Sequence, residues 1–485
     1  MNQNKVRVRF APSPTGYLHV GGLRTALYNY LFARKNNGVF ILRIEDTDRN
    51  RYVEGAVENL IATLRWAGLD YDEGPHKGGD YGPYFQSERL EIYRKYAEQL
   101  LSEGTAYRCF CASECLEKMR KTQEKMKLSS KYDRTCLHLP ESEIEKKLID
   151  GDPYVIRMKI PENRIIKFYD IIRQDVEFSS ELIDDQVLIK SDGYPTYHLA
   201  NVVDDHLMKI THVIRGEEWL SSVPKHILLY EYFGWEVPNL AHLPLLLNPD
   251  KSKLSKRQGD VAVEDYKAKG YLKEALVNFV AFLGWNPGTT QELFDLNQLI
   301  EQFSLERVNK AGAVFNIEKL NWLNFEHLRK KTEAEVLNML KDYLSQTEYK
   351  NLQLDDAYLL KVIEAMRARV TFIKDFVEKG KYFFEPPIIY DEEIVNKRWR
   401  EETPEQLKRL SEFFSGLTNP TKEDYEVALH KTAQSLNIGN GKLIHAVRLA
   451  VSGVGGGPGL YDILNILGKD ESIKRIENAI NRIKL

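Results

Sequence analysis

The sequence of 485 residues predicts an α/β fold built on a parallel sheet in its first part and an all-α fold in its last part. Two observations indicate the sheet: a strand–turn–helix pattern near the N-terminus, and a second apolar strand directly after it, an order that implies a parallel pair with a right-handed crossover. The third observation is that helical patterns with few strand candidates follow about Lys331. Because the chain is too long for one ordinary core, we expect two to four domains.

The first strand is predicted where apolar and basic residues alternate from Val6 to Phe10, with the period of two that strands show. After a turn rich in Pro and Gly, apolar residues recur at i, i+3, i+4, i+7 and i+8 from Leu23 to Leu31, which predicts an amphipathic helix. A turn that leads into a helix N-terminus presents unpaired N–H groups and a positive dipole end. It is therefore a natural place for phosphate.

The second strand, Val39–Ile44, is nearly continuous in apolar residues and is expected to be buried on both faces. It ends at Glu45, and ligands of such sheets bind outside the carboxyl ends of the strands, so the opening turn and Glu45 should share one crevice. Helices are expected at 53–68 and, after a loop at 81–89, up to about Gly104.

From about Thr105 to Pro195 the pattern changes to short strands, a lysine-rich helical stretch and turns, which indicates an insertion and not a continuation of the sheet. Parallel-sheet character returns at 211–214. A loop between helices is expected at 286–290. The glycine-rich stretch 453–459 is interpreted as a connection between helices, because it follows a helical stretch and lacks the Gly-Lys-Ser/Thr ending of a nucleotide loop.

Composition narrows the class of protein. With 43% apolar residues, no apolar segment of signal-peptide type and no stretch as long as a membrane span, we expect a cytosolic protein without a membrane partner. Four cysteines are too few for a disulfide scaffold and are better interpreted as free thiols or metal ligands. A net charge of −3 argues against a coat for nucleic acid but allows a basic stripe.

Two short motifs carry chemistry. In the stretch His19–Gly22 the glycines allow a ligand to approach the backbone, and the histidine can donate a hydrogen bond to phosphate. The stretch Lys253–Arg257 places two ammonium groups and a guanidinium in a short loop that could clamp a polyphosphate as charge develops. The alternative for the second motif is a solvated basic loop.

Together and in this order, these stretches resemble the HIGH and KMSKS signatures of class I aminoacyl-tRNA synthetases. Four further stretches make the sequence similar to the bacterial-type glutamyl-tRNA synthetases over essentially the whole chain: 9–16, 42–48, 194–201 and 213–220. There are two departures, since HIGH is His-Val-Gly-Gly here and KMSKS is Lys-Leu-Ser-Lys-Arg. Gly22 therefore cannot supply the phosphate contact of a second histidine.

The resemblance implies a domain plan. A class I catalytic domain of Rossmann type would occupy 1–104 and 196–250, interrupted at 105–195 by an α+β insertion for the tRNA acceptor end. A domain that carries the KMSKS loop and contacts the tRNA stem would follow at 251–330. The region 331–485 would be an all-α anticodon-binding domain.

The resemblance also implies an activity: ATP-dependent activation of L-glutamate to glutamyl-adenylate, then transfer to tRNA(Glu) by a monomer, with Mg²⁺ accompanying ATP. A side-chain carboxylate is best held by planar arginine forks, and the α-ammonium needs an acceptor. The residues that match the glutamate contacts of the family are Arg9, Ala11, Ser13, Glu45, Tyr197, Asn201 and Arg215.

The same resemblance assigns the ATP side of the site. The matching residues are His19, Gly21, Gly22, Glu218, Trp219 and Lys256. The α-carboxylate of glutamate attacks the α-phosphorus in line, so no protein nucleophile is required and catalysis should consist of positioning and charge stabilisation. The catalytic roles are implied for His19, Lys253 and Lys256.

The insertion contains one candidate metal site. Cys109, Cys111, Cys136 and His138 offer a tetrahedral set of three sulfurs and one nitrogen, although the Cys-x-Cys spacing is tighter than usual. The pattern resembles a structural Zn²⁺ site that some bacterial glutamyl enzymes carry, and a group of free buried thiols is the alternative. Cys115 stands outside the set.

Two other functions stay open at this point. One is a catalytically silent, tRNA-binding paralogue, which is disfavoured because the recognition and phosphate-binding residues are all present. The other is the relative that glutamylates a modified base in another tRNA, which resembles only the catalytic part and lacks the long helical domain.

Overall fold

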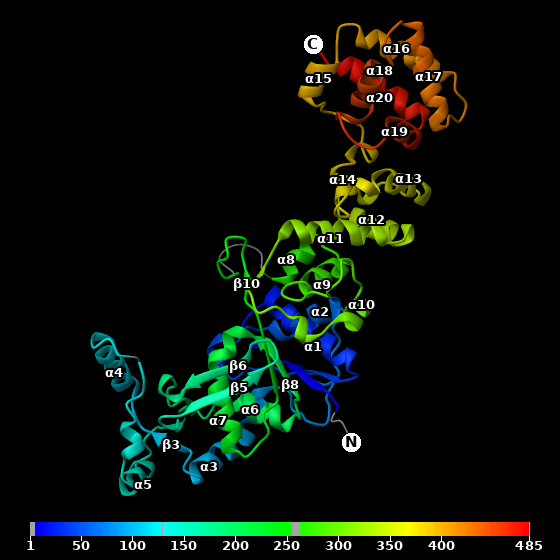
Figure 1. Ribbon diagram of the computed structural model, residues 1–485. Helices are drawn as coiled ribbons and strands as arrows, with labels where there is room; N and C mark the ends of the chain where they lie inside the picture. Colours follow the sequence, from blue (N-terminus) through cyan, green and yellow to red (C-terminus); the bar gives the residue numbers. More distant parts are fainter. Residues whose placement is uncertain (1–4, 129, 255–261, 485) are drawn as a thin grey trace. The chain divides into compact units, whose positions relative to one another are not determined.

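A computed structural model describes residues 5–128, 130–254 and 262–484, and Figure 1 traces them from blue to red. The chain divides into two compact units. The first consists of Met1–Lys269 and Lys273–Lys319, and the second of Gly270–Leu272 and Leu320–Leu485.

The first unit contains the predicted parallel sheet. Two of its parallel pairs are β1 (Arg7–Phe10) with β2 (Val39–Leu42), and β8 (His212–Gly216) with β9 (Asn239–Leu243). The pairs meet where the amide of Thr211 donates to the carbonyl of Arg7 at 2.9 Å. Strand β2 is buried throughout, as its apolar sequence predicts.

Three helices beside the sheet agree with the prediction: α1 (Val20–Lys35), α2 (Ala56–Trp66) and α3 (Leu90–Ser102). Two more helices, α6 (Tyr197–Leu207) and α7 (Val223–Tyr232), were not predicted from the sequence. Helix α2 starts three residues later than predicted, because Gly55 has a φ of 76°, outside the helical region. Strand β2 ends two residues early, and Ile44 pairs with Phe85 instead.

The insertion differs in one respect from the prediction. Its own antiparallel sheet contains β3 (Ala106–Cys109), β4 (Val155–Met158) and β7 (Val187–Ile189), with helices α4 (Ser113–Lys125) and α5 (Glu141–Ile149) nearby (Figure 1). The hairpin of β5 (Ile165–Asp170) and β6 (Gln174–Ser179), however, continues the main sheet, because Asp170 pairs with Leu240 of β9 in parallel. This part of 105–195 is therefore not separate from the sheet.

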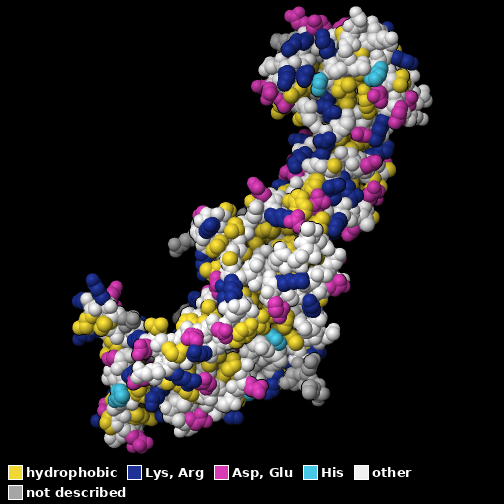
Figure 2. Space-filling view, in the orientation of Figure 1, with side chains coloured by type: hydrophobic (Ala, Val, Ile, Leu, Met, Phe, Trp, Pro, Cys, Tyr) yellow, Lys and Arg dark blue, Asp and Glu magenta, His cyan; other side chains and the backbone are white. Residues whose placement is uncertain are grey.

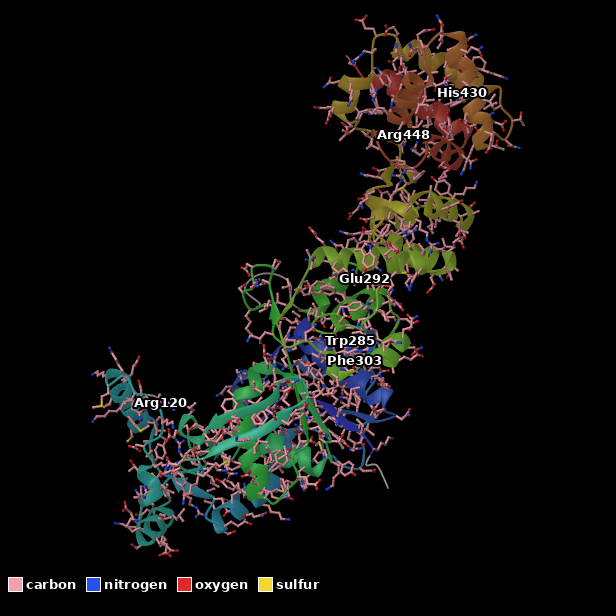
Figure 3. All side chains as sticks on the ribbon, viewed as in Figure 1. Arg120, Trp285, Glu292, Phe303, His430 and Arg448 are labelled. Atoms are coloured by element: carbon pink, nitrogen blue, oxygen red, sulfur yellow. The ribbon has the colours of Figure 1, made fainter. Side chains whose placement is uncertain are left out.

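The rest of the first unit follows the sheet. Its elements are β10 (Leu246–Leu247), α8 (Val263–Ala268), α9 (Lys273–Ala281), α10 (Leu296–Gln302) and β11 (Ala313–Val314). The segment 286–290 joins α9 to α10, as predicted. Figure 3 labels Trp285 and Phe303, whose ring centroids lie 5.7 Å apart in the core beside α10.

The second unit is helical in the part that the structure describes. Its helices are α11 (Ile317–Lys330), whose first three residues belong to the first unit, α12 (Glu333–Ser345), α13 (Asp356–Met366), α14 (Asp375–Glu378), α15 (Glu392–Arg398), α16 (Thr403–Ser415), α17 (Lys422–Ser435), α18 (Asn440–Ser452), α19 (Leu460–Leu467) and α20 (Lys469–Arg482). The segment 453–459 joins α18 to α19, as predicted, and Arg448 (labelled in Figure 3) donates to the carbonyl of Pro458 at 2.8 Å. Among the described residues, none of the helices has both the length and the apolar character that a membrane crossing needs.

Candidate active site

A cavity of about 570 Å³ lies at the carboxyl ends of β1 and β8 and the N-terminus of α1. This is the edge where ligands of parallel sheets bind. The site residues from the sequence analysis that line it are Arg9, Ala11, Ser13, His19, Gly21, Gly22, Glu45, Tyr197, Asn201, Arg215, Glu218, Trp219 and Lys253. Lys256 lies outside the described residues.

Arg9 belongs to a buried ionic network. Its Nε and Nη2 donate to the two carboxylate oxygens of Asp205 on α6, at 3.0 and 3.1 Å. Arg43 donates to the same carboxylate at 2.7 Å. Burial disfavours ionisation of Asp205, but the two guanidinium groups outweigh burial and lower its pKa. The Nη1 of Arg9 has no hydrogen bond to any described residue and remains available at the cavity.

The same network holds two further site residues. With its oxygen turned toward the guanidinium groups, the Asn201 amide accepts from Arg9 and Arg43 at 3.2 and 3.1 Å. Glu45 accepts from Arg43 through Oε1 at 3.1 Å, and its Oε2 has no hydrogen bond within the described chain. Burial raises the pKa of Glu45, against the effect of Arg43 and Arg9.

Arg215 is held in a different way. Its Nε donates to Nε2 of His242 at 3.0 Å, and its Nη1 donates to the Tyr197 hydroxyl at 2.5 Å. Its Nη2 lies 3.5 Å from Nδ1 of His226. No carboxylate of the described residues lies within 4.0 Å of this guanidinium, although Arg215 is only 5% exposed. A buried guanidinium without a carboxylate partner is costly to keep, so the site is prepared for an anion.

His19 occupies the N-cap of α1, where its Nδ1 accepts from the amide of Gly22 at 3.0 Å. In the neutral ring the hydrogen is therefore on Nε2. The two glycines also lie close to neighbouring side chains. A Cβ at Gly22 would lie 2.6 Å from the end of the Leu18 side chain, and one at Gly21 would lie 3.0 Å from the His19 ring. A larger residue at either position would therefore make a neighbouring side chain move.

The opposite wall of the cavity comes from the short 3-10 helix Glu217–Ser222 and the turn after β10. The Trp219 ring lies against Tyr197 with centroids 4.2 Å apart. Glu218 folds back on Gly216, where a Cβ would lie 2.2 Å from its carboxylate. Lys253 is exposed and pairs with Leu247 in an antiparallel bridge, and residues 255–261 of the basic stretch and its continuation lie outside the described residues.

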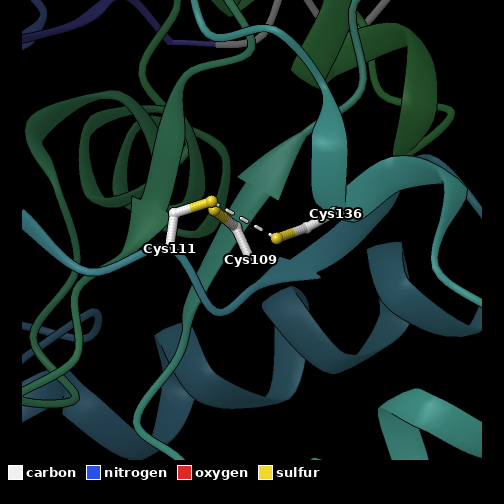
Figure 4. Close-up of side chains that lie close together, drawn as sticks. All are labelled: Cys109, Cys111 and Cys136. Atoms are coloured by element: carbon white, nitrogen blue, oxygen red, sulfur yellow. Dashed lines mark hydrogen bonds between the residues drawn. The ribbon is translucent and has the colours of Figure 1, made fainter. Parts of the chain in front are cut away.

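The three predicted cysteine ligands lie together, as Figure 4 shows. Their sulfur atoms are within 4.8 Å of one another, with Cys111 and Cys136 3.5 Å apart. His138 follows Cys136 in the same 3-10 helix, but its ring is not part of this group. The Tyr132 hydroxyl lies 3.3 Å from Sγ of Cys111 instead. Cys115 is exposed and stands apart, as predicted.

Sequence reasoning missed Asp205 and His242. The sequence does contain a signal for Asp205. This residue follows Tyr197 and Asn201 at the spacing i, i+4 and i+8, so all three share one face of α6. His242 had none, because its contact with Arg215 depends on the register between β8 and β9, in which these two residues are direct partners.

Comparison with known proteins agrees with this geometry. The family described as "tRNA synthetases class I (E and Q), catalytic domain" matches residues 5–322, and the "Anticodon binding domain" family matches residues 324–480. The chain belongs to the class I tRNA synthetases. This class I tRNA synthetase is 56% identical to the glutamate–tRNA ligase of Chloroherpeton thalassium, over 100% of this chain and 99% of that protein.

A second relative, the glutamate–tRNA ligase of Chlorobaculum parvum, is 53% identical over 100% of this class I tRNA synthetase and 99% of its own length. A solved structure of a glutamate tRNA ligase from Elizabethkingia meningosepticum in complex with its amino acid is 43% identical, with a TM-score of 0.95. It covers 99% of this synthetase and 100% of that chain. The predicted family and fold class are confirmed.

Proposed function

We propose that this class I tRNA synthetase is a glutamate–tRNA ligase, which uses ATP with Mg²⁺ to form glutamyl-adenylate and then charges tRNA(Glu). The observation that carries the proposal is Arg215, a buried guanidinium at the cavity without a carboxylate partner among the described residues. An amino acid with a side-chain carboxylate would supply that partner. The relatives named above carry the same activity in their names. The protein would act as a monomer in the cytoplasm.

Glutamate would lie between charges of both signs. Arg215 would meet the side-chain carboxylate with its charge, while Arg9, already paired with Asp205, would add a directed N–H from Nη1. Glu45 would accept the α-ammonium through Oε2. Polar contacts would complete the site through the backbone of Ala11 and the side chains of Ser13, Tyr197 and Asn201.

ATP would occupy the end of the cavity at α1. The helix N-terminus and His19 would hold phosphate, with Gly21 and Gly22 against the nucleotide and Glu218 and Trp219 beside the adenosine. When the α-carboxylate attacks the α-phosphorus, Lys253 and Lys256 would stabilise the charge on the departing pyrophosphate. Mg²⁺ would enter with ATP and neutralise phosphate charge.

The test is pyrophosphate exchange with glutamate, run with and without tRNA, together with charging of purified tRNA(Glu). We expect exchange that depends on tRNA, and an aminoacyl ester on the tRNA 3′ end. A silent paralogue would show no exchange under any condition. Exchange without tRNA, with glutamate attached to a base of another tRNA, would favour the base-modifying relative.

His19 has two roles, the N-cap of α1 and the proposed contact with phosphate, and different substitutions can separate them. Asn at position 19 can still cap α1, whereas Ala cannot, so His19→Ala should lose about 1 kcal/mol of stability that His19→Asn keeps. Both variants should slow adenylate formation about 10- to 100-fold, with the KM for glutamate unchanged. Single-turnover kinetics and thermal unfolding measure the two effects. A change confined to the KM for glutamate would contradict this role.

The tRNA would be held by separate parts of the chain. We assign the acceptor end to 105–195, the stem to 251–330 and the anticodon to 331–485, the region that largely coincides with the anticodon-binding family match. Figure 2 shows Lys and Arg side chains gathered over α15, which contributes Lys397 and Arg398. Helix α15 packs against α18, which carries His445 and Arg448. Burial, followed by the charges of Arg398 and Arg448, lowers the pKa of His445. Such a cluster suits a phosphate backbone.

The cysteine group would hold a structural Zn²⁺, with thiolates from Cys109, Cys111 and Cys136 and the imidazole of His138 turned in as fourth ligand. Elemental analysis should find about one zinc per chain in the wild type and loss of zinc in Cys136→Ser. His138→Ala should bind zinc more weakly, and Tyr132→Phe should bind it normally. The reverse result would make the Tyr132 hydroxyl the fourth ligand.

A further inference from the structure

Three polar side chains stand in a row across the carboxyl ends of neighbouring strands. Arg215 of β8 is the register partner of His242 of β9, and Asp170 ends β5 beside β9. His242 and Asp170 are completely buried, and Arg215 nearly so. Only Arg215 of the three lines the cavity. The three side chains therefore connect the buried interior of the sheet, at Asp170, with the cavity, at Arg215.

The contacts determine which ring nitrogen of His242 carries the hydrogen. Its Nδ1 lies 2.6 Å from Oδ2 of Asp170, and its Nε2 accepts from Arg215 at 3.0 Å. A neutral ring with hydrogen on Nδ1 satisfies both contacts, and a ring with hydrogen on Nε2 satisfies neither. Burial lowers the pKa of His242 to about 4, which keeps the ring neutral near pH 7.

Asp170 is itself held in place. Its Oδ1 accepts from the amides of Ile172 and Arg173 at 2.9 and 2.8 Å, and its Oδ2 accepts from the His242 amide at 3.1 Å. Burial opposes its ionisation, but the hydrogen bonds from His242 and these amides outweigh burial and lower its pKa. The carboxylate is thus a rigid acceptor that orients the ring.

The neutral state of the His242 ring matters because Arg215 has no carboxylate partner among the described residues. A carboxylate in the place of His242 would form an ion pair, as Asp205 does with Arg9. The other partners of Arg215, the Tyr197 hydroxyl and His226, are also uncharged groups, and burial holds the pKa of His226 well below its usual value. Neutral acceptors orient a guanidinium without neutralising it.

We propose that His242, held by Asp170, is a positioning residue for substrate recognition: it fixes the Arg215 guanidinium through Nε and leaves its charge for the substrate carboxylate. This inference rests on the proposed function, in which that carboxylate belongs to glutamate. It goes beyond that function by assigning specificity to two residues that do not line the cavity.

The tautomer of His242 depends on Asp170, so a substitution of Asp170 can change it. In Asp170→Asn the amide can keep its oxygen on the Ile172 and Arg173 amides and turn its NH₂ toward His242. The ring would then carry its hydrogen on Nε2 and oppose the N–H of Arg215. Glutamine at position 242 has no tautomers and can accept from Arg215 through its side-chain oxygen.

The experiment measures the KM for glutamate and for ATP in tRNA-dependent pyrophosphate exchange. We expect His242→Leu to raise the KM for glutamate about 10- to 100-fold and His242→Gln to stay within about threefold of wild type. Asp170→Asn should raise it about 10-fold in the wild type and less than about twofold in the His242→Gln background. The KM for ATP should stay within about twofold throughout.

His212→Leu is the matched control. His212 is the first residue of β8, and its ring lies tilted against that of Phe32 with centroids 4.8 Å apart. Within the described chain it has no interaction with Arg215. The His212→Leu variant should leave the KM for glutamate and the KM for ATP unchanged. Equal losses from Asp170→Asn in the two backgrounds, or equal increases in the KM for ATP, would overturn the positioning role. A wild type without glutamate-dependent exchange would instead refute the proposed function.

Discussion

Replacing Arg215 with methionine is expected to remove glutamate recognition while leaving the folded protein about as stable as the wild type. The substitution keeps the apolar stem and deletes a buried charge that has no carboxylate partner among the described residues. The cost of burying that charge disappears, and the loss of hydrogen bonds to His242 and Tyr197 offsets this gain. The free energy of unfolding should therefore change by less than about 1 kcal/mol.

The effect on glutamate should be much larger. The bound carboxylate would lose its guanidinium partner in a buried site, which costs about 3–5 kcal/mol and raises the KM for glutamate by about two to four orders of magnitude. Glutamate should raise the melting temperature of the wild type and not that of Arg215→Met. Arg34→Met, which removes a partly exposed ion pair with Asp72, is the control and should change neither property appreciably. Strong destabilisation by Arg215→Met would show that the guanidinium serves the fold.

Unlike Arg215→Met, the Asp205→Ala variant should lose much of the stability of the folded protein. The Asp205 carboxylate is 2% exposed and is the acceptor for both Arg9 and Arg43. Its removal leaves Arg9 without an ion pair, and it leaves Arg43 with only its longer ion pairs to Glu45 and Asp204. Breaking a buried ionic network in this way costs about 3–5 kcal/mol.

Denaturant unfolding, followed with a probe in the first unit, measures this loss. Asp48→Ala is the control, since Asp48 pairs with Arg51 on the exposed surface, and it should cost less than about 1 kcal/mol. Adding Arg9→Met to Asp205→Ala should recover part of the loss, because one uncompensated charge is removed. Additive losses from the two substitutions would contradict the network.

The contrast between the two arginines was not visible in the sequence. Arg9 and Arg215 have the same residue type, the same position at the end of a strand and the same match to the family. The counter-ion of Arg9 is Asp205 on α6, 196 residues later in the chain. Arg215 instead contacts the neutral rings of His242 and His226. Charge pairing across such a distance depends on how α6 packs on the sheet, which local periodicity does not encode.

The sequence by itself determined the parallel pair around the opening turn, the crevice shared by that turn and Glu45, the helical second unit and the family. These features follow from patterns within short stretches, since strand and helix periods and turn residues act locally. Only the tertiary structure decided that the β5–β6 hairpin joins the main sheet, that the Tyr132 hydroxyl contacts a cysteine sulfur while His138 lies outside the cysteine group, and that His242 supports Arg215. Each of these depends on register or burial between distant segments, where one residue of displacement changes the partner.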